Sequence, residues 1–157
     1  MKGARGNNMI EIVNLTKNYG QIKAVDNLNF TVEKGEILGF LGPNGAGKTT
    51  TMNIITGYIS SSEGTVKVCR YDILENPGEV KKRIGYLPEQ PPLYMDMTVK
   101  DYLNFACDLK RVDKKNRKSQ IYDIMELVKI THVKDRLIKN LSKGYKQRVG
   151  LAQALVG

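Results

Sequence analysis

The first half of the chain alternates apolar and polar residues, a pattern typical of β-strands with one buried face. Five short segments are predicted as strands, at residues 9–15, 28–33, 36–41, 64–68 and 84–87. The alternation is clearest in the second of them, where Leu28, Phe30 and Val32 are separated by polar residues. The third segment is an apolar run, which predicts a buried strand, and Pro88 ends the fifth.

Helical spacing replaces this alternation in the second half of the chain. Two apolar stripes recur at i, i+3, i+4 and i+7: Val99, Tyr102, Leu103 and Ala106, and then Ile121, Ile124, Met125 and Val128. Thr98 and Asp101 form an acidic variant of the capping box before the first stripe. Shorter helices are predicted over 48–57, with Gly57 as its cap, and over 80–83. The chain is therefore predicted to be an α/β core followed by a separate helical lobe.

Residues 42–49 match the phosphate-binding P-loop pattern and stand between a predicted strand and a predicted helix. A Gly-rich turn lets backbone N–H groups approach phosphates, and the following helix points its positive end at them. Lys48 is expected to reach the β- and γ-phosphates, and Thr49 to offer its hydroxyl to Mg²⁺. The alternative, a Gly-rich turn without a ligand, gives Lys48 and Thr49 no role. The predicted nucleotide site comprises Gly42, Pro43, Asn44, Gly45, Ala46, Gly47, Lys48, Thr49 and Thr50.

Length and composition narrow the class of protein. The chain has 157 residues, enough for one medium domain with a hydrophobic core. No apolar stretch is long enough to predict a membrane span. No apolar segment follows Lys2 and Arg5, which argues against a secretory signal. Cys69 and Cys107 are isolated and fit neither a metal site nor a disulfide framework, so a reduced, cytosolic compartment is expected.

Positive charge is concentrated in one segment of the chain. The formal net charge is +9, and residues 110–148 contain thirteen Lys and Arg against four acidic residues. Such a segment can indicate nucleic acid or an anionic membrane surface. We favour a solvated turn between helices, with Lys110, Arg111, Lys114, Lys115, Arg117 and Lys118 exposed. A further alternative is that balancing acids lie beyond Gly157.

Together with the P-loop, four segments resemble the ATP-binding subunit of an ABC transporter. In family order they are Lys17-Asn18-Tyr19-Gly20, Tyr86-Leu87-Pro88-Glu89-Gln90, Thr98-Val99 and Leu141-Ser142-Lys143-Gly144-Tyr145. The resemblance covers about residues 10–157. It implies an α/β fold, with a P-loop NTPase core of ABC type, an N-terminal antiparallel β-subdomain and an inserted α-helical subdomain. The implied boundaries are 1–90 for the β-subdomain and ATP-binding core, 91–140 for the helical subdomain and 141–157 for the signature motif and its helix.

The resemblance also implies roles for residues outside the P-loop. Tyr19 corresponds to the aromatic residue that stacks on adenine, and Gln90 to the Q-loop glutamine beside Mg²⁺ and the attacking water. Ser142 and Gly144 correspond to the signature residues that bind the γ-phosphate of ATP held by a second subunit. Three alternatives stay open: Tyr19 packs on its own strand, Gln90 is an exposed turn residue, and Ser142 is a plain helix N-cap.

With these roles, the resemblance implies Lys48 and Gln90 as catalytic residues and Thr49 and Gln90 as ligands of Mg²⁺. ATP and Mg²⁺ are the expected cofactors. The expected partners are a membrane permease and a second ATPase subunit in a head-to-tail dimer, with no nucleic acid. The expected location is cytoplasmic, peripheral on the inner face of the cell membrane.

The chain departs from the common family pattern at two places. Lys143 and Tyr145 replace a glycine and a glutamine of the usual signature motif, a form similar to the ATPases of ABC-2-type exporters. The family's Walker B motif, with its Mg²⁺-binding Asp and catalytic Glu, does not occur, because no carboxylate follows Asp135. The single histidine, His132, precedes the signature and is expected to be a surface residue between helices.

These observations favour an ABC transporter subunit that couples ATP binding and hydrolysis to transport, with export favoured by the subgroup. Because Walker B is absent, the 157-residue chain by itself is expected to be inactive and marginally stable or self-associating. One alternative is a non-catalytic nucleotide-binding module that acts on nucleic acid through its basic helical lobe. Another is a regulatory product that pairs with a full-length subunit.

Overall fold

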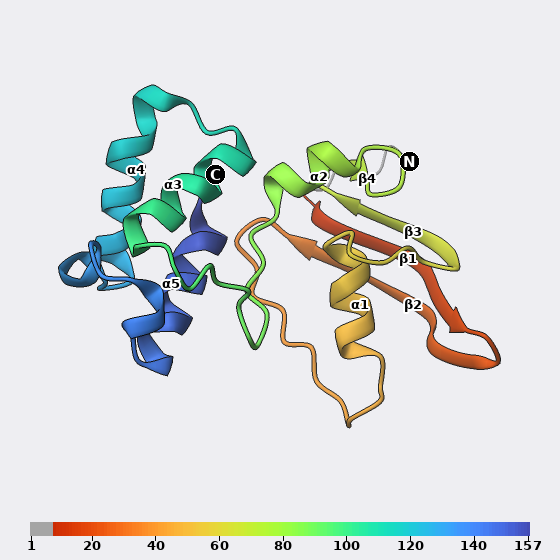
Figure 1. Ribbon diagram of the computed structural model, residues 1–157. Helices are drawn as coiled ribbons and strands as arrows, with labels where there is room; N and C mark the ends of the chain where they lie inside the picture. Colours follow the sequence, from red (N-terminus) through yellow and green to blue (C-terminus); the bar gives the residue numbers. More distant parts are fainter. Residues whose placement is uncertain (1–7) are drawn as a thin grey trace. The chain divides into compact units, whose positions relative to one another are not determined.

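The structure is a computed structural model that describes residues 8–157 (Figure 1). The chain divides into two compact units, Met1–Arg83 and Ile84–Gly157. The first contains the β-sheet and two helices, and the second is helical. We describe each unit in turn.

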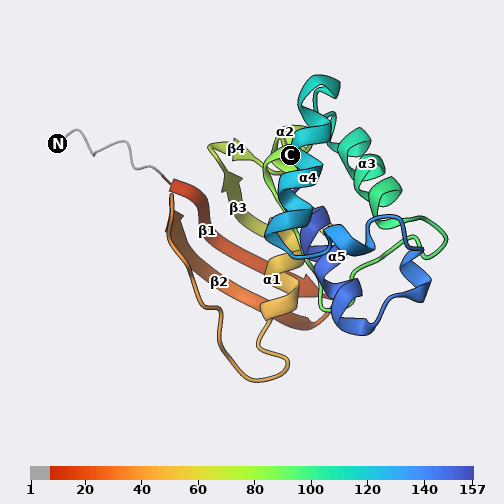
Figure 2. The same ribbon diagram turned by 90° about the vertical axis from the view of Figure 1, so that its left-hand side faces the viewer.

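The first unit is built on a four-stranded antiparallel sheet of order β2-β1-β3-β4. Its strands are β1 (Asn8–Tyr19), β2 (Ile22–Glu33), β3 (Glu63–Val68) and β4 (Tyr71–Asp72). The helices are α1 (Lys48–Ile55) and α2 (Pro77–Arg83). Figures 1 and 2 show α1 lying against one face of the sheet, in contact with β2 and β3. The strands predicted at 9–15, 28–33 and 64–68 are confirmed, and the first two extend beyond those bounds.

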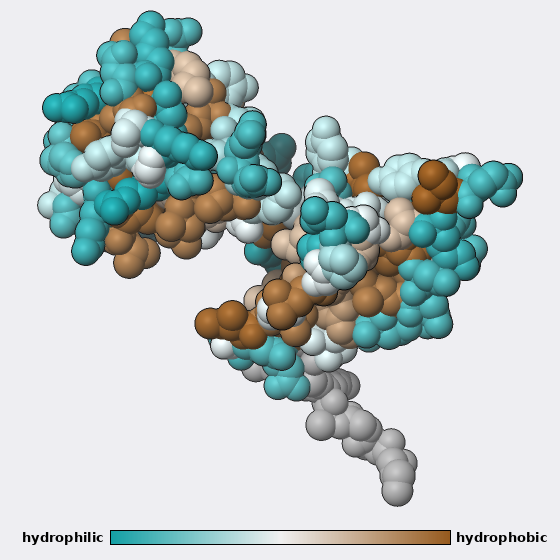
Figure 3. Space-filling view, turned by 90° about the horizontal axis from the view of Figure 1, so that it is seen from below, coloured by the Kyte–Doolittle hydropathy of each residue, from teal (hydrophilic) through white to brown (hydrophobic). Residues whose placement is uncertain are grey.

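The segment predicted as a strand at 36–41 is not a strand, and that prediction is wrong. A strand needs a neighbour to receive its backbone hydrogen bonds, and no strand of the described chain pairs with this segment. Two of its apolar side chains stay in solvent, since Ile37 is 97% exposed and Leu41 is 94% exposed. Figure 3 shows apolar side chains at the surface of this unit.

The second unit has a hydrophobic core of its own. Its helices are α3 (Val99–Lys110), α4 (Lys114–Leu127), η1 (Thr131–Val133), η2 (Ile138–Asn140) and α5 (Lys143–Leu155). Both predicted apolar stripes are buried in this core, where Leu103, Ile121 and Met125 pack together. The predicted cap is confirmed, because the Thr98 side chain accepts a hydrogen bond from the N–H of Asp101 at 3.1 Å.

The segment predicted as a strand at 84–87 is also not a strand. It lies instead along α5, where two glycines permit the close approach. A Cβ at Gly85 would clash with the carbonyl oxygen of Ala154, and a Cβ at Gly150 would lie 2.7 Å from the Pro91 side chain. The backbone of 85–91 therefore packs on the helix that follows the signature motif.

Candidate functional site

The P-loop is a turn that ends at the first residue of α1. Gly47 is the N-cap of this helix and has a φ of 79°. A side chain at this position would meet the Ala24 carbonyl oxygen and lie 3.0 Å from Val25. Glycine is therefore required here both by backbone conformation and by the approach of β2. The predicted helix after the loop is confirmed, and Gly57 follows its C-terminus with a φ of 69°.

The amino group of Lys48 lies over the loop. Its Nζ donates to the carbonyl oxygens of Gly42 and Pro43, each at 2.7 Å. The ammonium group is thereby held at the mouth of the turn rather than extended into solvent. Thr51, one turn into the helix, is buried and donates from Oγ1 to the Gly47 carbonyl at 3.0 Å.

The amino terminus of α1 is suited to an anion. Within the described part of the chain no side chain caps it, and its first turn contains no acidic residue. The unpaired N–H groups and the positive end of the helix dipole are thus available to phosphate oxygens. Thr49 is exposed and Thr50 is half-buried at this end of the helix. These features fit a nucleoside phosphate.

Tyr19 is the last residue of β1 and belongs to the same unit as the P-loop. Its side chain is 50% exposed, and the Lys17 ammonium lies 5.2 Å from the ring centroid. A half-exposed aromatic ring at a strand end can stack on a flat ligand.

The signature residues lie at the amino terminus of α5. Ser142 is the N-cap, and its hydroxyl accepts from the N–H of Tyr145 at 3.5 Å. Gly144 is exposed, with no atom within 4 Å of the position a Cβ would take. The bare backbone at Gly144 and the positive helix end leave room for an anion at this terminus. The N-cap position of Ser142 is compatible with a phosphate-binding signature residue and also with a plain helix cap.

Tyr145 is held by contacts that the sequence did not indicate. The Nε2 of His132 lies 3.0 Å from the Tyr145 hydroxyl, and the two rings meet edge to face with centroids 5.5 Å apart. On the same ring, the Arg148 guanidinium lies 5.7 Å from the centroid. His132 is exposed, as expected, and lies in the short helix η1. No pattern along the chain connects residues 132 and 145, so only the fold reveals this cluster.

Gln90 is exposed and lies in a bend of the segment that packs on α5. Gln90, Ser142 and Gly144 therefore belong to one unit, while Tyr19 and the P-loop belong to the other. Among residues 8–157 no group of three or more His, Cys, Asp or Glu side chains is placed to hold a metal ion. No helix in the same range is long and apolar enough to cross a membrane.

Comparison with known proteins gives a family match over most of the chain. The family model described as "ABC transporter" matches residues 25–157. The bacitracin transport ATP-binding protein BcrA of Bacillus licheniformis is 38% identical over 148 residues, which are 94% of this chain and 47% of BcrA. The SkfA peptide export ATP-binding protein SkfE of Bacillus subtilis is 35% identical over 94% of this chain and 61% of its own length. The chain thus spans about half the length of BcrA.

Solved structures give the same fold. An ATP-binding subunit of an ABC transporter superposes with a TM-score of 0.86 at 24% identity, over 94% of this chain and 62% of that one. A dimeric bacterial ABC transporter cassette superposes with a TM-score of 0.80 at 26% identity, over 93% of this chain and 68% of that one. These matches confirm the predicted α/β fold of ABC type, with its antiparallel β-subdomain and helical subdomain. The nucleic-acid alternative finds no support among them.

Proposed function

Because this chain belongs to the ABC transporter family, we propose that it is part of a transport ATPase that binds ATP at the P-loop of residues 42–49. The observation that carries the proposal is the geometry around Lys48. Its ammonium group lies at the mouth of a glycine turn, in front of an uncapped helix terminus. That arrangement combines a point charge, free amides and a helix dipole, which together suit a triphosphate.

Tyr19 supplies the adenine contact in this proposal. Its ring is half exposed and belongs to the unit that contains the P-loop. Mg²⁺ would neutralise the phosphates, with the Thr49 hydroxyl and the Gln90 amide oxygen as its protein ligands. Lys48 then stabilises charge on the phosphates, and Gln90 orients the attacking water.

The signature residues are proposed to act on a second subunit. Ser142 and Gly144 offer a hydroxyl and an unobstructed backbone N–H at the amino terminus of α5. These groups suit the γ-phosphate of ATP bound to a partner ATPase in a head-to-tail dimer. One of the similar solved structures is a dimeric ABC transporter cassette, which supports this arrangement.

Export through a separate membrane permease is the proposed process. Relatives named for bacitracin transport and for SkfA peptide export support it, as does the Lys143 and Tyr145 form of the signature. The protein would then lie on the cytoplasmic face of the cell membrane, attached through the permease.

ATP titration of the wild type and of three variants tests the binding proposal. Lys48→Ala removes a charge-assisted contact worth about 1.5–3 kcal/mol, so a loss of roughly 10- to 150-fold in affinity is expected. Thr49→Ala should weaken binding only when Mg²⁺ is present. Lys34→Ala, an exposed lysine of the same unit, is the matched control and should bind as the wild type does. Equal affinity in the Lys48 and Lys34 variants would refute the P-loop site.

A further inference from the structure

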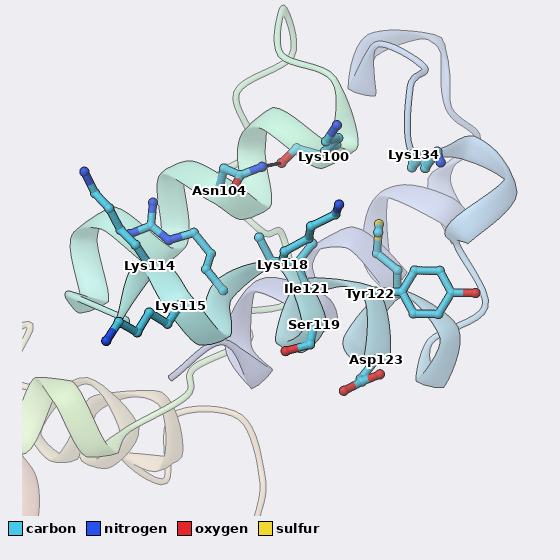
Figure 4. A pocket seen from close by; sticks show the side chains of 12 residues that line it. Lys100, Asn104, Lys114, Lys115, Lys118, Ser119, Ile121, Tyr122, Asp123 and Lys134 are labelled. Atoms are coloured by element: carbon cyan, nitrogen blue, oxygen red, sulfur yellow. Dashed lines mark hydrogen bonds between the residues drawn. The ribbon is translucent and has the colours of Figure 1, made fainter.

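The second unit contains a pocket with an unusual concentration of positive charge. Its volume is about 840 Å³, within the range of small-molecule sites, and α3, α4 and the segment containing Lys134 line it (Figure 4). Six of its lining residues are Lys or Arg, and Asp123 is the one acidic residue among them. Part of the basic segment predicted to be solvated therefore surrounds a hollow.

Three of these lysines come from different parts of the fold. Lys100 lies on α3, Lys118 on α4 and Lys134 after η1, and the Lys100 N–H donates to the Lys134 carbonyl at 2.9 Å. Figure 4 shows the amino groups of Lys100 and Lys118 on the same side of the pocket, whereas the Asp123 carboxylate points away from them. We refer to Lys100, Lys118 and Lys134 as the lysine triad.

No acidic side chain neutralises the triad within residues 8–157. None of its ammonium groups takes part in an ion pair there, whereas Arg117 pairs with Asp108 at 2.6 Å. The hydrogen bond from the Lys100 N–H to the Lys134 carbonyl joins the two backbone segments that carry these lysines beside the pocket. An anion in the pocket would meet positive charge from three segments of the fold, with Asp123 as the one acidic residue in the lining.

Two residues of the hydrophobic core also line the pocket. Ile121 and Met125 are each 4% exposed and belong to the hydrophobic core of the unit. Ile121 and Met125 line the same pocket as the three lysines, so part of its wall is apolar. The Asn104 amide is already used, since it donates to the Lys100 carbonyl at 2.9 Å.

We propose that this pocket is a binding site for a phosphate-bearing anion, held by the lysine triad. Lysine is a common phosphate ligand because its ammonium is a compact charge with three donors. Two sources supply this chemistry: the headgroup of an anionic lipid and a soluble phosphate compound. Clusters of Lys on an amphipathic helix such as α4 are typical of the lipid case.

The test uses the intact protein and two probes. The first is sedimentation with vesicles of phosphatidylcholine, with and without phosphatidylglycerol. The second is titration with tripolyphosphate in a Lys48→Ala background, so that the P-loop does not contribute. The pocket variant carries Lys100→Gln, Lys118→Gln and Lys134→Gln. The control carries Lys34→Gln, Lys67→Gln and Lys129→Gln, which removes equal charge at exposed positions.

Each lysine of the triad is expected to contribute about fivefold to the binding affinity. The pocket variant should therefore bind the probe roughly 100-fold more weakly than the control. Loss in the vesicle arm identifies a lipid, and loss in the tripolyphosphate arm a soluble phosphate. Equal loss in pocket variant and control would show only general attraction and overturn the proposal. So would the absence of binding in both arms. If the triple variant does not fold, the exposed single change Lys118→Glu replaces it.

Discussion

The Nε2 of His132 and the hydroxyl of Tyr145 lie 3.0 Å apart, joining the short helix η1 to the first turn of α5. This contact fixes the side chain of a residue where the signature motif departs from its usual form. Arg148 covers the same ring, so Tyr145 is held from two sides. The tyrosine therefore fastens the amino terminus of α5 to the preceding segment.

Tyr145→Phe tests that role. The change keeps the ring against Arg148 and removes the hydrogen bond to His132, so a loss of about 0.5–1.5 kcal/mol in unfolding free energy is expected. Chemical denaturation followed by circular dichroism measures it. Tyr122→Phe is the control, because the Tyr122 side chain is 52% exposed. If His132→Ala lowers stability equally in the wild type and in the Tyr145→Phe variant, the two residues are not coupled.

Gly150 and Gly144 are both in α5 but have opposite surroundings. Alanine raises helix propensity by about 1 kcal/mol at either position, and Gly144→Ala should therefore stabilise the fold. Gly150→Ala should destabilise it by about 1–3 kcal/mol, since its Cβ would press on Pro91 and Leu87 at 2.7 and 2.9 Å. Thermal unfolding of both variants measures these two changes in stability. Stabilisation by Gly150→Ala would mean that 85–91 does not pack on α5 as described.

The cap of α3 gives a third prediction. The Thr98 hydroxyl accepts from the Asp101 N–H at 3.1 Å and donates to its carboxylate at 2.7 Å. Thr98→Ala should cost about 1 kcal/mol of unfolding free energy, whereas Thr98→Ser, which keeps the oxygen, should cost little. Urea denaturation compares the two variants. Equal losses would assign the effect to the methyl group instead.

Glu79 should titrate abnormally. Hydrogen bonds from Lys82 and Arg83, at 2.6 and 2.7 Å, together with their charges, lower the pKa of Glu79 from 4.5 to about 2. A carboxyl with a depressed pKa contributes stability above pH 4.5 and loses it as the pH falls toward 2. The stability difference between wild type and Glu79→Gln should therefore shrink over that interval. NMR titration of the Glu79 carboxyl supplies the direct check, and a midpoint near 4.5 would contradict the contacts.

Local patterns predicted the elements whose partners lie in the same part of the chain. The alternation around Leu28 and the stripe around Leu103 each mark a buried face, and the structure buries Leu103 completely. The apolar run around Ile37 carried the same kind of signal but formed no strand. An apolar run indicates a segment that is suited to burial. Whether the segment forms a strand depends on a neighbouring strand to pair with, which no local pattern contains.

The features of the candidate site also differ in whether local sequence could predict them. The turn and helix around Lys48 could be predicted because the P-loop motif is continuous in sequence and its geometry is local. The contact of Tyr145 with His132 and the lysine triad could not, since each joins residues that only packing brings together. The charges of residues 110–148 were visible in the sequence, but the pocket that some of them surround was not.

Lys48 also stabilises the P-loop turn itself. Its two hydrogen bonds to Gly42 and Pro43 tie the end of the loop to its beginning, so the turn is preorganised by the same ammonium group that is proposed to meet the phosphates. Ligand binding then becomes an exchange, in which phosphate oxygens replace or share two carbonyl acceptors. A Lys48 variant consequently measures loosening of the turn together with loss of charge, whereas a Thr49 variant leaves both carbonyl contacts and the ammonium charge in place.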